Sequence, residues 1–235
     1  SSGFSLSAAL LMKRTMKKIL KMAQTVPEQT HKKFKQLEKQ ATKCRLCPAL
    51  ANQPAILSST NGNLNSKIVF VAEAPGRFGA GRTGIPFHGD KSGDNFETLL
   101  KHIDLTRADV FITNAALCNP LENGNNRRPK ASEIKNCSPF LKETLNLINP
   151  EVVVTLGSVG LQALNHLLET RYQLKENVAQ PLVMHHFILF PLYHPSPRVA
   201  NWMRPLSQQK KDFNKLLRNI SVCKKSTTKK LSDTN

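Results

Sequence analysis

Residues 68–76 read Ile-Val-Phe-Val-Ala-Glu-Ala-Pro-Gly, an apolar run that ends in a turn carrying a carboxylate. A continuous apolar run of this kind is typical of a strand that is buried on both faces of a parallel sheet. Residues 110–113, 152–155 and 187–190 form three further runs of β-branched, aromatic or aliphatic side chains. The sequence therefore predicts four buried strands that lie parallel in one sheet.

Segments with helical periodicity separate these runs. Apolar side chains recur at i, i+3, i+4 and i+7 from Phe96 to Ile103, behind the capping candidates Ser92 and Asp94, and similar patterns cover 134–148, 161–168 and 213–217. Strands that alternate with helices predict an α/β fold, a three-layer α/β/α sandwich with a central four-stranded parallel sheet. We expect this domain to span residues 41–220, between a basic, partly helical N-terminal extension (1–40) and a disordered lysine-rich tail (221–235).

The chain is strongly basic, with 34 lysines and arginines against 16 acidic residues and a formal net charge of +18. An excess of this size favours a polyanionic partner. No apolar run approaches the roughly 18 residues that a membrane span needs, so we expect no membrane partner. The basic residues between positions 13 and 21 fit a helix that contacts phosphates, which we favour, or an organelle transit peptide.

Four cysteines suggest a metal or cluster site. Cys44 and Cys47 have the spacing C-x-x-C, and Cys118 and Cys137 can complete a set of four thiolate ligands. This usage is typical of metal or cluster ligation in a reducing compartment rather than of disulfides. Zinc is the rival ligand, although the gap between Cys118 and Cys137 resembles neither a finger nor a ribbon knuckle, and buried free thiols are a further alternative.

Polar residues follow three of the four predicted strands, and ligands of such sheets bind at the carboxyl ends of the strands. Glu73 and the glycine-rich loop that reaches Asp90 follow the first strand, Asn114 ends the second, and His194 follows the fourth. The glycines permit close approach to a ligand, and an asparagine amide can read the edge of a base. In isolation, each has a plainer interpretation: solvated acids in an ordinary loop, a turn-capping asparagine and a structural histidine.

Together these motifs resemble the uracil-DNA glycosylase superfamily, specifically its iron–sulfur branch, families 4 and 5. The resemblance covers about residues 44–217, and the cysteine arrangement matches the 4Fe–4S ligands of that branch. Residues 79–94, Gly-Ala-Gly-Arg-Thr-Gly-Ile-Pro-Phe-His-Gly-Asp-Lys-Ser-Gly-Asp, and Asn123 are most similar to family 5. The segments Glu73-Ala-Pro-Gly and Thr113-Asn114 look like family 4, and His194-Pro-Ser-Pro-Arg198 is similar to family 3. Family 5 usually has an apolar residue where Glu73 stands, so we place the chain beside family 5 with features of family 4.

The resemblance implies a monofunctional DNA repair glycosylase, a hydrolase of base excision repair. It would flip uracil, or another deaminated base such as hypoxanthine or xanthine, out of DNA and leave an abasic site. The implied catalytic residues are His194, Asp90, Glu73 and Asn123. The implied contacts to the base are Ala74, Gly76, Phe87 and Asn114, and those to DNA are Arg82, Ser196, Pro197 and Arg198. The implied ligands of the 4Fe–4S cluster, or of zinc as the alternative, are Cys44, Cys47, Cys118 and Cys137.

We expect a monomer that acts on DNA in the cytoplasm or nucleoid of a prokaryote, with organelle targeting by the basic N-terminus as the alternative. Two other functions remain open on the residues alone. One is an iron–sulfur protein of the same fold that binds damaged DNA with weak or no catalysis. The other is a zinc-stabilised α/β protein of unrelated chemistry.

Overall fold

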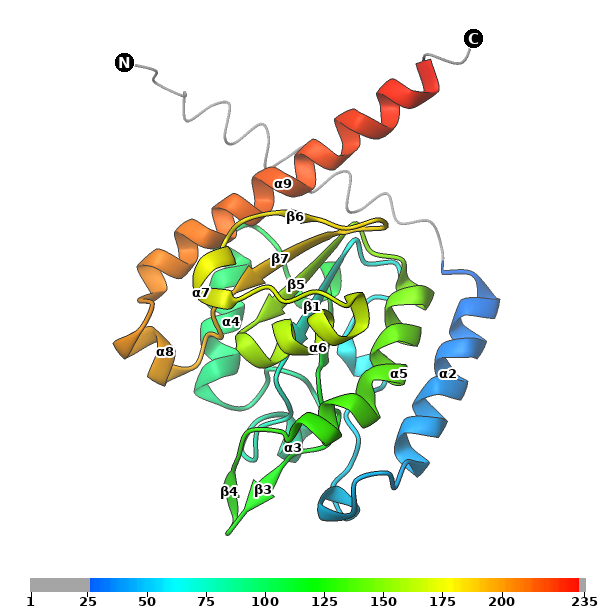
Figure 1. Cartoon of the computed structure of the whole chain (residues 1–235), viewed down its shortest axis with the longest axis vertical. Coiled ribbons are helices and arrows are strands. Elements are labelled where there is room, and N and C mark those ends of the chain that lie inside the picture. The colour runs from blue at the N-terminus through cyan, green and yellow to red at the C-terminus, as the bar shows by residue number, and fades with distance from the viewer. Residues whose placement is uncertain (1–25, 233–235) are drawn as a thin grey trace.

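The structure, a computed structural model, describes residues 26–232, and its side chains are described as far as Asn219. A five-stranded sheet lies at the centre, in the order β2-β1-β5-β7-β6 (Figure 1). The strands β1 (Ile68–Ala72), β2 (Phe111–Asn114), β5 (Val152–Leu156) and β7 (Ile188–Leu192) are mutually parallel, as the apolar runs predict. The predicted count of four is wrong by one strand, because β6 (Leu182–Val183) pairs antiparallel with β7. A two-residue strand is too short to leave a periodic signal in the sequence.

Helices cover both faces of the sheet, which confirms the three-layer sandwich. Alternate residues of β1 point to opposite faces: Phe70 packs in one core with α4 (Lys91–His102) and α9 (Leu206–Ser232). Val69 and Val71 pack in the other core with α2 (Glu28–Lys43), α5 (Ala131–Ile148) and α6 (Ser158–Leu168). Each core covers one face of the sheet, so the sheet is a buried middle layer.

The N-terminal part of the domain begins earlier than predicted, because helix α2 is part of the packed fold. Its residues Phe34, Leu37 and Ala41 are buried, and the Phe34 ring meets Phe111 of β2 edge-on at 5.8 Å between centroids. A boundary at residue 41 would cut this helix. The basic cluster between residues 13 and 21 lies outside the described residues.

The C-terminal segment also differs from the prediction. Helix α9 continues to Ser232, where the lysine-rich composition had favoured disorder from residue 221. Its sequence from 206 to 232 holds neither proline nor glycine, so no residue interrupts the helical hydrogen bonding. In Figure 1 the end of this helix projects beyond the body of the domain.

Shorter elements connect the layers and surround one edge of the sheet. They are η1 (Pro48–Leu50), η2 (Ser59–Asn61), α3 (Ala80–Thr83), η3 (Arg107–Asp109), the hairpin of β3 (Leu121–Glu122) and β4 (Asn125–Asn126), α7 (Leu174–Asn177) and α8 (Pro197–Trp202). Within the described range, none of the helices is long and apolar enough to cross a membrane.

The parallel register brings the carboxyl ends of the strands together. Ala72 of β1 pairs with Asn114 of β2, and Leu156 of β5 pairs with Leu192 of β7. The chain leaves β1 toward β2 on one side and later returns to β5 on the other, so a topological switch point lies at β1. Ligands bind at such a point in open α/β sheets.

Candidate active site

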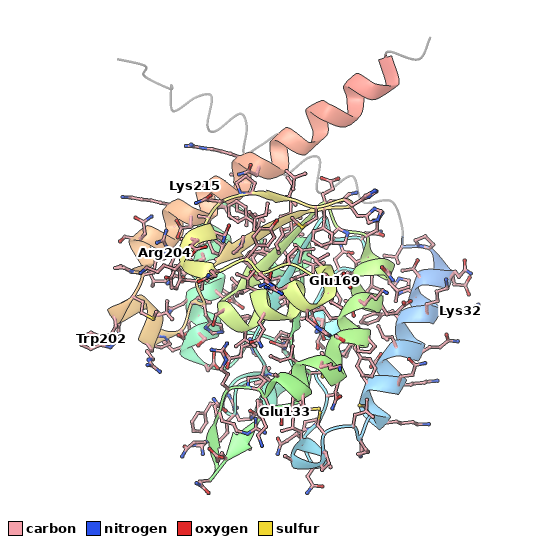
Figure 2. The ribbon with its side chains drawn as sticks, viewed as in Figure 1. Lys32, Glu133, Glu169, Trp202, Arg204 and Lys215 are labelled. Atoms are coloured by element: carbon pink, nitrogen blue, oxygen red, sulfur yellow. The ribbon has the colours of Figure 1, made fainter. Side chains whose placement is uncertain are left out.

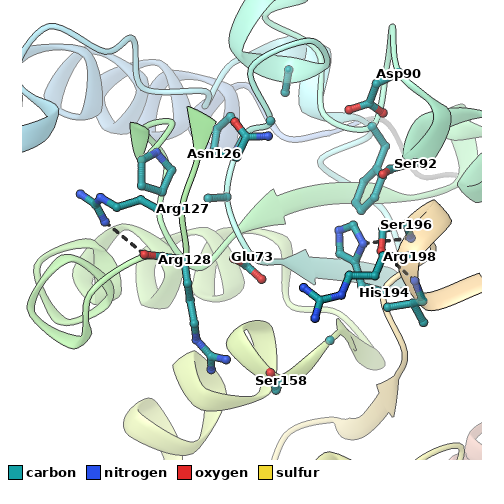
Figure 3. Close-up of a pocket in the computed structure, with 18 of the residues that line it drawn as sticks. Glu73, Asp90, Ser92, Asn126, Arg127, Arg128, Ser158, His194, Ser196 and Arg198 are labelled. Atoms are coloured by element: carbon teal, nitrogen blue, oxygen red, sulfur yellow. Dashed lines mark hydrogen bonds between the residues drawn. The ribbon is translucent and has the colours of Figure 1, made fainter. Parts of the chain in front are cut away.

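A cavity of about 610 Å³ opens at this edge of the sheet. Its walls come from the turn after β1, the start of α4, the β3–β4 hairpin, the start of α6 and the segment from β7 into α8 (Figure 3). The structure brings eight of the predicted site residues to this cavity: Glu73, Ala74, Gly76, Phe87, Asp90, His194, Ser196 and Arg198. They derive from segments up to 125 positions apart in the sequence, between Glu73 and Arg198.

His194 presents one nitrogen to the protein. Its Nδ1 accepts a hydrogen bond from the Ser196 backbone N–H at 3.1 Å, so the proton of the neutral ring is on Nε2. Burial lowers the pKa of His194 to about 4, although the nearby Asp90 raises it. The turn is held from outside the cavity, because Asn95 Nδ2 of α4 donates to the Pro195 carbonyl at 2.8 Å. The result is a neutral imidazole with one N–H available as a donor.

Glu73 is the second titratable group of the cavity. Burial raises the pKa of its carboxyl group, and the charge of Arg128 acts in the opposite direction. Arg128 reaches the cavity from the exit of the β3–β4 hairpin, and its Nη2 donates to Gln162 of α6 at 3.3 Å. Figure 3 shows the Glu73 carboxylate between Arg128 and His194. A half-buried acid between an arginine and a neutral histidine can hold a water molecule or face a developing cation.

Asp90 has a structural as well as a potential chemical role. It is the N-cap of α4, and its Oδ1 accepts from the Gly93 N–H at 2.9 Å. The predicted caps Ser92 and Asp94 are therefore wrong, since the helix begins earlier. The loop packs tightly against the other carboxylate oxygen: a Cβ added at Gly79 would lie 2.4 Å from Asp90 Oδ2. Glycine is needed there because any side chain would displace this carboxylate.

Asn114 lies at the end of β2, buried and outside the set of residues that line the cavity. Its Nδ2 has no hydrogen-bond partner among the described residues. A buried amide nitrogen without a partner carries a desolvation cost that a ligand can relieve. Asn114 therefore stays a candidate contact to a ligand, although it does not line the cavity.

Three other predicted residues lie away from the cavity. Asn123 is the exposed first residue of an Asn-Gly turn between β3 and β4, with φ 49°, and Gly124 follows at φ 74°. Two successive positive φ values are typical of a type I′ hairpin, so the Asn-Gly pair is a turn signal. Arg82 donates hydrogen bonds to the Phe78 and Gly89 carbonyls, and Pro197 is the first residue of the short helix α8.

The asparagines that do line the cavity flank the hairpin, Asn119 before it and Asn126 at its end. Asn126 Oδ1 accepts from the Arg77 N–H at 2.9 Å, which ties the hairpin to the glycine-rich loop. Arg127 makes a two-fold hydrogen bond of 2.8 and 2.6 Å to the buried Glu133, and this pairing lowers the pKa of Glu133. The hairpin is thus fixed at both of its sides, and it delivers Arg128 to the cavity.

Sequence reasoning missed several lining residues: Ser92, Asn119, Asn126, Arg127, Arg128, Ser158, Tyr193 and Met203. Ser158 follows the third buried strand, so the strand-end rule that found Glu73 and His194 also points to it. The Asn-Gly turn was the available signal for a hairpin that carries Asn126 and Arg128. Tyr193 precedes His194 and had no separate signal.

Comparison with known proteins shows to which family a chain with this site belongs. A sequence model of the Uracil DNA glycosylase superfamily matches residues 59–219, which include every cavity-lining residue. The chain belongs to the uracil-DNA glycosylase superfamily. The match begins after Cys44 and Cys47, so the first cysteine pair lies outside the superfamily segment.

Relatives of two types are found within the superfamily. A Type-4 uracil-DNA glycosylase of Thermotoga maritima is 39% identical over 119 residues, covering 51% of this chain and 59% of the relative. A Type-4 uracil-DNA glycosylase of Sulfurisphaera tokodaii is 32% identical over 174 residues, covering 71% and 76%. A Type-5 uracil-DNA glycosylase of Pyrobaculum aerophilum is 34% identical over 156 residues, covering 60% and 66%. The chain thus spans less than two thirds of the length of two of these three relatives, those of Thermotoga maritima and Pyrobaculum aerophilum. The predicted placement near families 4 and 5 is confirmed.

The four cysteines of this superfamily member gather beside α5. The pKa of Cys118 is raised to about 11 and that of Cys137 to about 12, chiefly by burial and further by the other thiols, Cys44 and Cys47 among them. Asn136 joins two of the segments, since its Nδ2 donates to the Leu46 carbonyl at 3.1 Å and to Cys47 Sγ at 3.4 Å. In the described part of the chain, no three Cys, His, Asp or Glu side chains are drawn together tightly enough for one metal ion. The fit to a metal group rests on four soft sulfur donors that lie within electrostatic reach of each other.

Proposed function

We propose that this protein is a DNA glycosylase that excises uracil by hydrolysis of the N-glycosidic bond. The observation that carries the proposal is the cavity itself, in which a neutral histidine donor, a half-buried glutamate and an aromatic ring face one space within a uracil-DNA glycosylase superfamily domain. A uracil inside a duplex cannot reach such a cavity, so the enzyme must flip the nucleotide out of the stack.

Charge supports DNA as the partner. The net charge of +18 favours a polyanion, and Arg128 and Arg198 line the cavity itself. Figure 3 shows the Arg198 side chain, which extends from the first turn of α8 toward the cavity. We infer that Ser196 and Arg198 contact the phosphates next to the flipped nucleotide.

Base recognition would combine stacking with an amide contact. Phe87 offers an aromatic face for the uracil ring, and Ala74 and Gly76 line the same cavity. The unpartnered Asn114 Nδ2 would donate to uracil O4, and its Oδ1 would accept from N3–H. Cytosine presents an amino donor at C4 and an acceptor at N3, so the same amide orientation would oppose like groups on that base.

Bond cleavage places negative charge on uracil O2 and positive charge on the sugar. His194 Nε2–H would donate to O2 as the charge develops, which a preorganised donor does at no reorganisation cost. The Glu73 carboxylate, with Arg128 beside it, would stabilise the sugar cation or orient the attacking water. Asp90 uses its Oδ1 to cap the helix, so its Oδ2 would be the atom that helps to stabilise the sugar cation or to orient the water.

Cys44, Cys47, Cys118 and Cys137 would hold a 4Fe–4S cluster, with zinc as the alternative group. Such a group would cross-link the segment before η1 to the segment before the hairpin and to α5. The chemistry of base hydrolysis needs no redox step, so its part here is structural.

The test is cleavage of labelled oligonucleotides that contain uracil, hypoxanthine or xanthine, single- and double-stranded, read on alkaline gels. We expect alkali-labile abasic sites from uracil with the wild type, and a loss of about 10²–10³-fold in rate with His194→Ala, the scale of one preorganised donor. Products from the purine analogues would extend the substrate range. Retained binding to uracil-DNA without product would reject the enzyme and favour a damage-binding protein.

A further inference from the structure

Phe87 has an unusual backbone for an aromatic residue. Its φ is 50°, in the left-handed region that side chains other than glycine seldom adopt. Such a conformation is unfavourable and persists only where the surrounding structure enforces it. The contacts that enforce it therefore determine where the ring of this cavity residue lies.

Arg107 supplies the enforcing contact from outside the cavity. It begins η3, it does not line the cavity, and its side chain is about one quarter exposed (26%). Its Nη1 donates to the Phe87 carbonyl at 3.3 Å, and its Nη2 donates to the carbonyl of Pro86. One planar guanidinium thus holds two successive carbonyl groups of the strained turn, a geometry that a single ammonium group does not reproduce.

Helix α4 packs against the same carbonyl. A Cβ added at Gly93 would lie 2.4 Å from the Phe87 oxygen, so the first turn of α4 packs directly on this peptide. Glu97, on the next turn of α4, has its Oε1 3.8 Å from Arg107 Nη1. The turn at Phe87 is therefore enclosed between η3 and α4.

The held backbone places the ring between the core and the catalytic histidine. The Phe87 ring stacks on the buried Phe96 at 4.7 Å between centroids and 25° between planes. It also faces the His194 ring at 5.3 Å and 36°. A change in the backbone at Phe87 would move the ring relative to both the base site and the imidazole.

We propose that Arg107 is a positioning residue that holds the Phe87 ring where it can stack on the flipped base and keeps the ring in its position relative to His194. This rests on the proposed function, because the stacking partner is the excised base. Misplacement of a positioning group by about 1 Å can cost on the order of 10²-fold in rate.

A double-mutant cycle tests the proposal. Single-turnover excision of uracil is measured for Arg107→Gln, Phe87→Leu and the double variant, with the exposed Arg171→Gln as a control that removes the same charge. We expect Arg107→Gln to slow excision by at least about tenfold in the wild-type background, and by less than about twofold in the Phe87→Leu background. Arg171→Gln should change neither rate. Equal effects of Arg107→Gln in both backgrounds, or none in the wild type, would overturn the proposal.

A second measurement does not depend on activity. Nuclear magnetic resonance of the His194 ring in the free protein reports the position of the adjacent Phe87 ring through its ring current. Arg107→Gln should shift the His194 ring signals in the same direction as Phe87→Leu, whereas Arg171→Gln should leave them in place. Unshifted signals in Arg107→Gln would reject the positioning role even if the wild type proved inactive on uracil, so the two proposals fail separately. Should Arg107→Gln not fold, Arg107→Lys takes its place in both measurements.

Discussion

The His194 imidazole has one nitrogen committed to the Ser196 backbone and one free to act on a ligand. Burial disfavours the charged form, so in the proposed reaction this residue would act as a neutral donor rather than as a general acid. An imidazolium would also place an N–H on Nδ1, directly against the N–H of Ser196. The same group would therefore link the proposed catalysis to the response of the fold to acid.

The pH dependence of stability should show this burial. The pKa of His194 is lowered from 6.5 to about 4 in the folded state, so between these values the unfolded chain binds more protons. Stability from this residue is fully present above pH 6.5 and is lost as the pH falls toward 4. From about pH 7 to about pH 5 the loss amounts to about 2 kcal/mol.

Urea unfolding of the wild type and of His194→Asn at both pH values measures this loss of stability. The wild type should lose more stability on acidification than the variant, by that amount. A variant that is as acid-sensitive as the wild type would contradict the assignment of a buried neutral ring. The comparison cancels the contribution of the remaining histidines.

The charge of Arg128 acts on the carboxyl group of Glu73. Burial raises the pKa of Glu73 and Arg128 opposes the rise, so Arg128→Gln should raise it further. If the carboxylate is the active form, the acidic limb of the rate profile moves to higher pH. Single-turnover excision should therefore fall more at about pH 5.5 than at about pH 8.

Glu73→Gln provides the matched control for this shift. It should slow excision throughout and remove the effect of Arg128→Gln on the profile. An unchanged profile in Arg128→Gln would place the titrating acid elsewhere.

At the scale of elements, helix α4 serves the fold and the site together. Its first turn carries the Asp90 cap and the close contact of Gly93 with Phe87, and its interior carries Asn95, which holds the His194 turn. The apolar face of the same helix packs in the core beside Phe70. One helix thus connects the interior packing to three groups of the cavity.

Two substitutions at Asp90 separate its roles. Asparagine keeps an N-cap oxygen, whereas alanine removes it at a cost of about 1 kcal/mol. We expect Asp90→Asn to keep the melting temperature and to slow excision, and Asp90→Ala to lower both. Thermal melts and single-turnover rates measure this. Equal rates for Asp90→Asn and the wild type would reduce Asp90 to a cap.

Packing also fixes the segment that runs from His194 into α9 along the cavity. Arg204 binds the buried Asp212 of α9 through two hydrogen bonds, of 2.5 and 2.7 Å, and lies over the Tyr193 ring at 5.5 Å. Trp202 is 84% exposed and points away from the body of the domain (Figure 2). The pair Arg204–Asp212 thus anchors the chain just after α8, while Trp202 at the end of α8 is exposed to solvent.

At the scale of the whole molecule, the cysteine group joins segments that are distant in the sequence. Cys44 and Cys47 follow α2, Cys118 precedes the hairpin, and Cys137 lies in α5. Crosslinking these segments would stabilise the hairpin that carries Arg128 and the packing of α2 on α5. A metal group bound only in the folded state contributes its binding free energy to folding.

Cys44→Ala tests the nature of this group. Wild-type protein purified without oxygen should contain iron and absorb at about 400 nm, as expected for an iron–sulfur cluster bound by thiolates. The variant should lose both and melt at a lower temperature, with activity lost through unfolding. Zinc without iron would establish the alternative metal, and a stable, fully active, metal-free variant would refute the structural role. Cys223 lies outside the proposed ligand set, so Cys223→Ala serves as the matched control.

The sequence by itself determined the three-layer α/β fold, the four parallel strands and the superfamily. Strand and helix patterns depend on local spacing of apolar residues, and the strand-end rule located Glu73, Asn114 and His194 because parallel strands end at one edge. The sequence did not predict β6, because two residues are too few to show a periodic pattern. It also did not predict the full extent of α9, because the lysine-rich composition favoured disorder.

Only the tertiary structure decided which polar residues meet. Asn95 reaches Pro195 across 100 positions, Arg107 reaches Phe87 across 20, and Arg128 approaches Glu73 from a hairpin whose Asn-Gly turn carries Asn123 away from the cavity. These relations depend on how helices and loops pack over the sheet. Side-chain contacts of that kind have no periodic signature in the chain, since the spacing that produces them is in three dimensions.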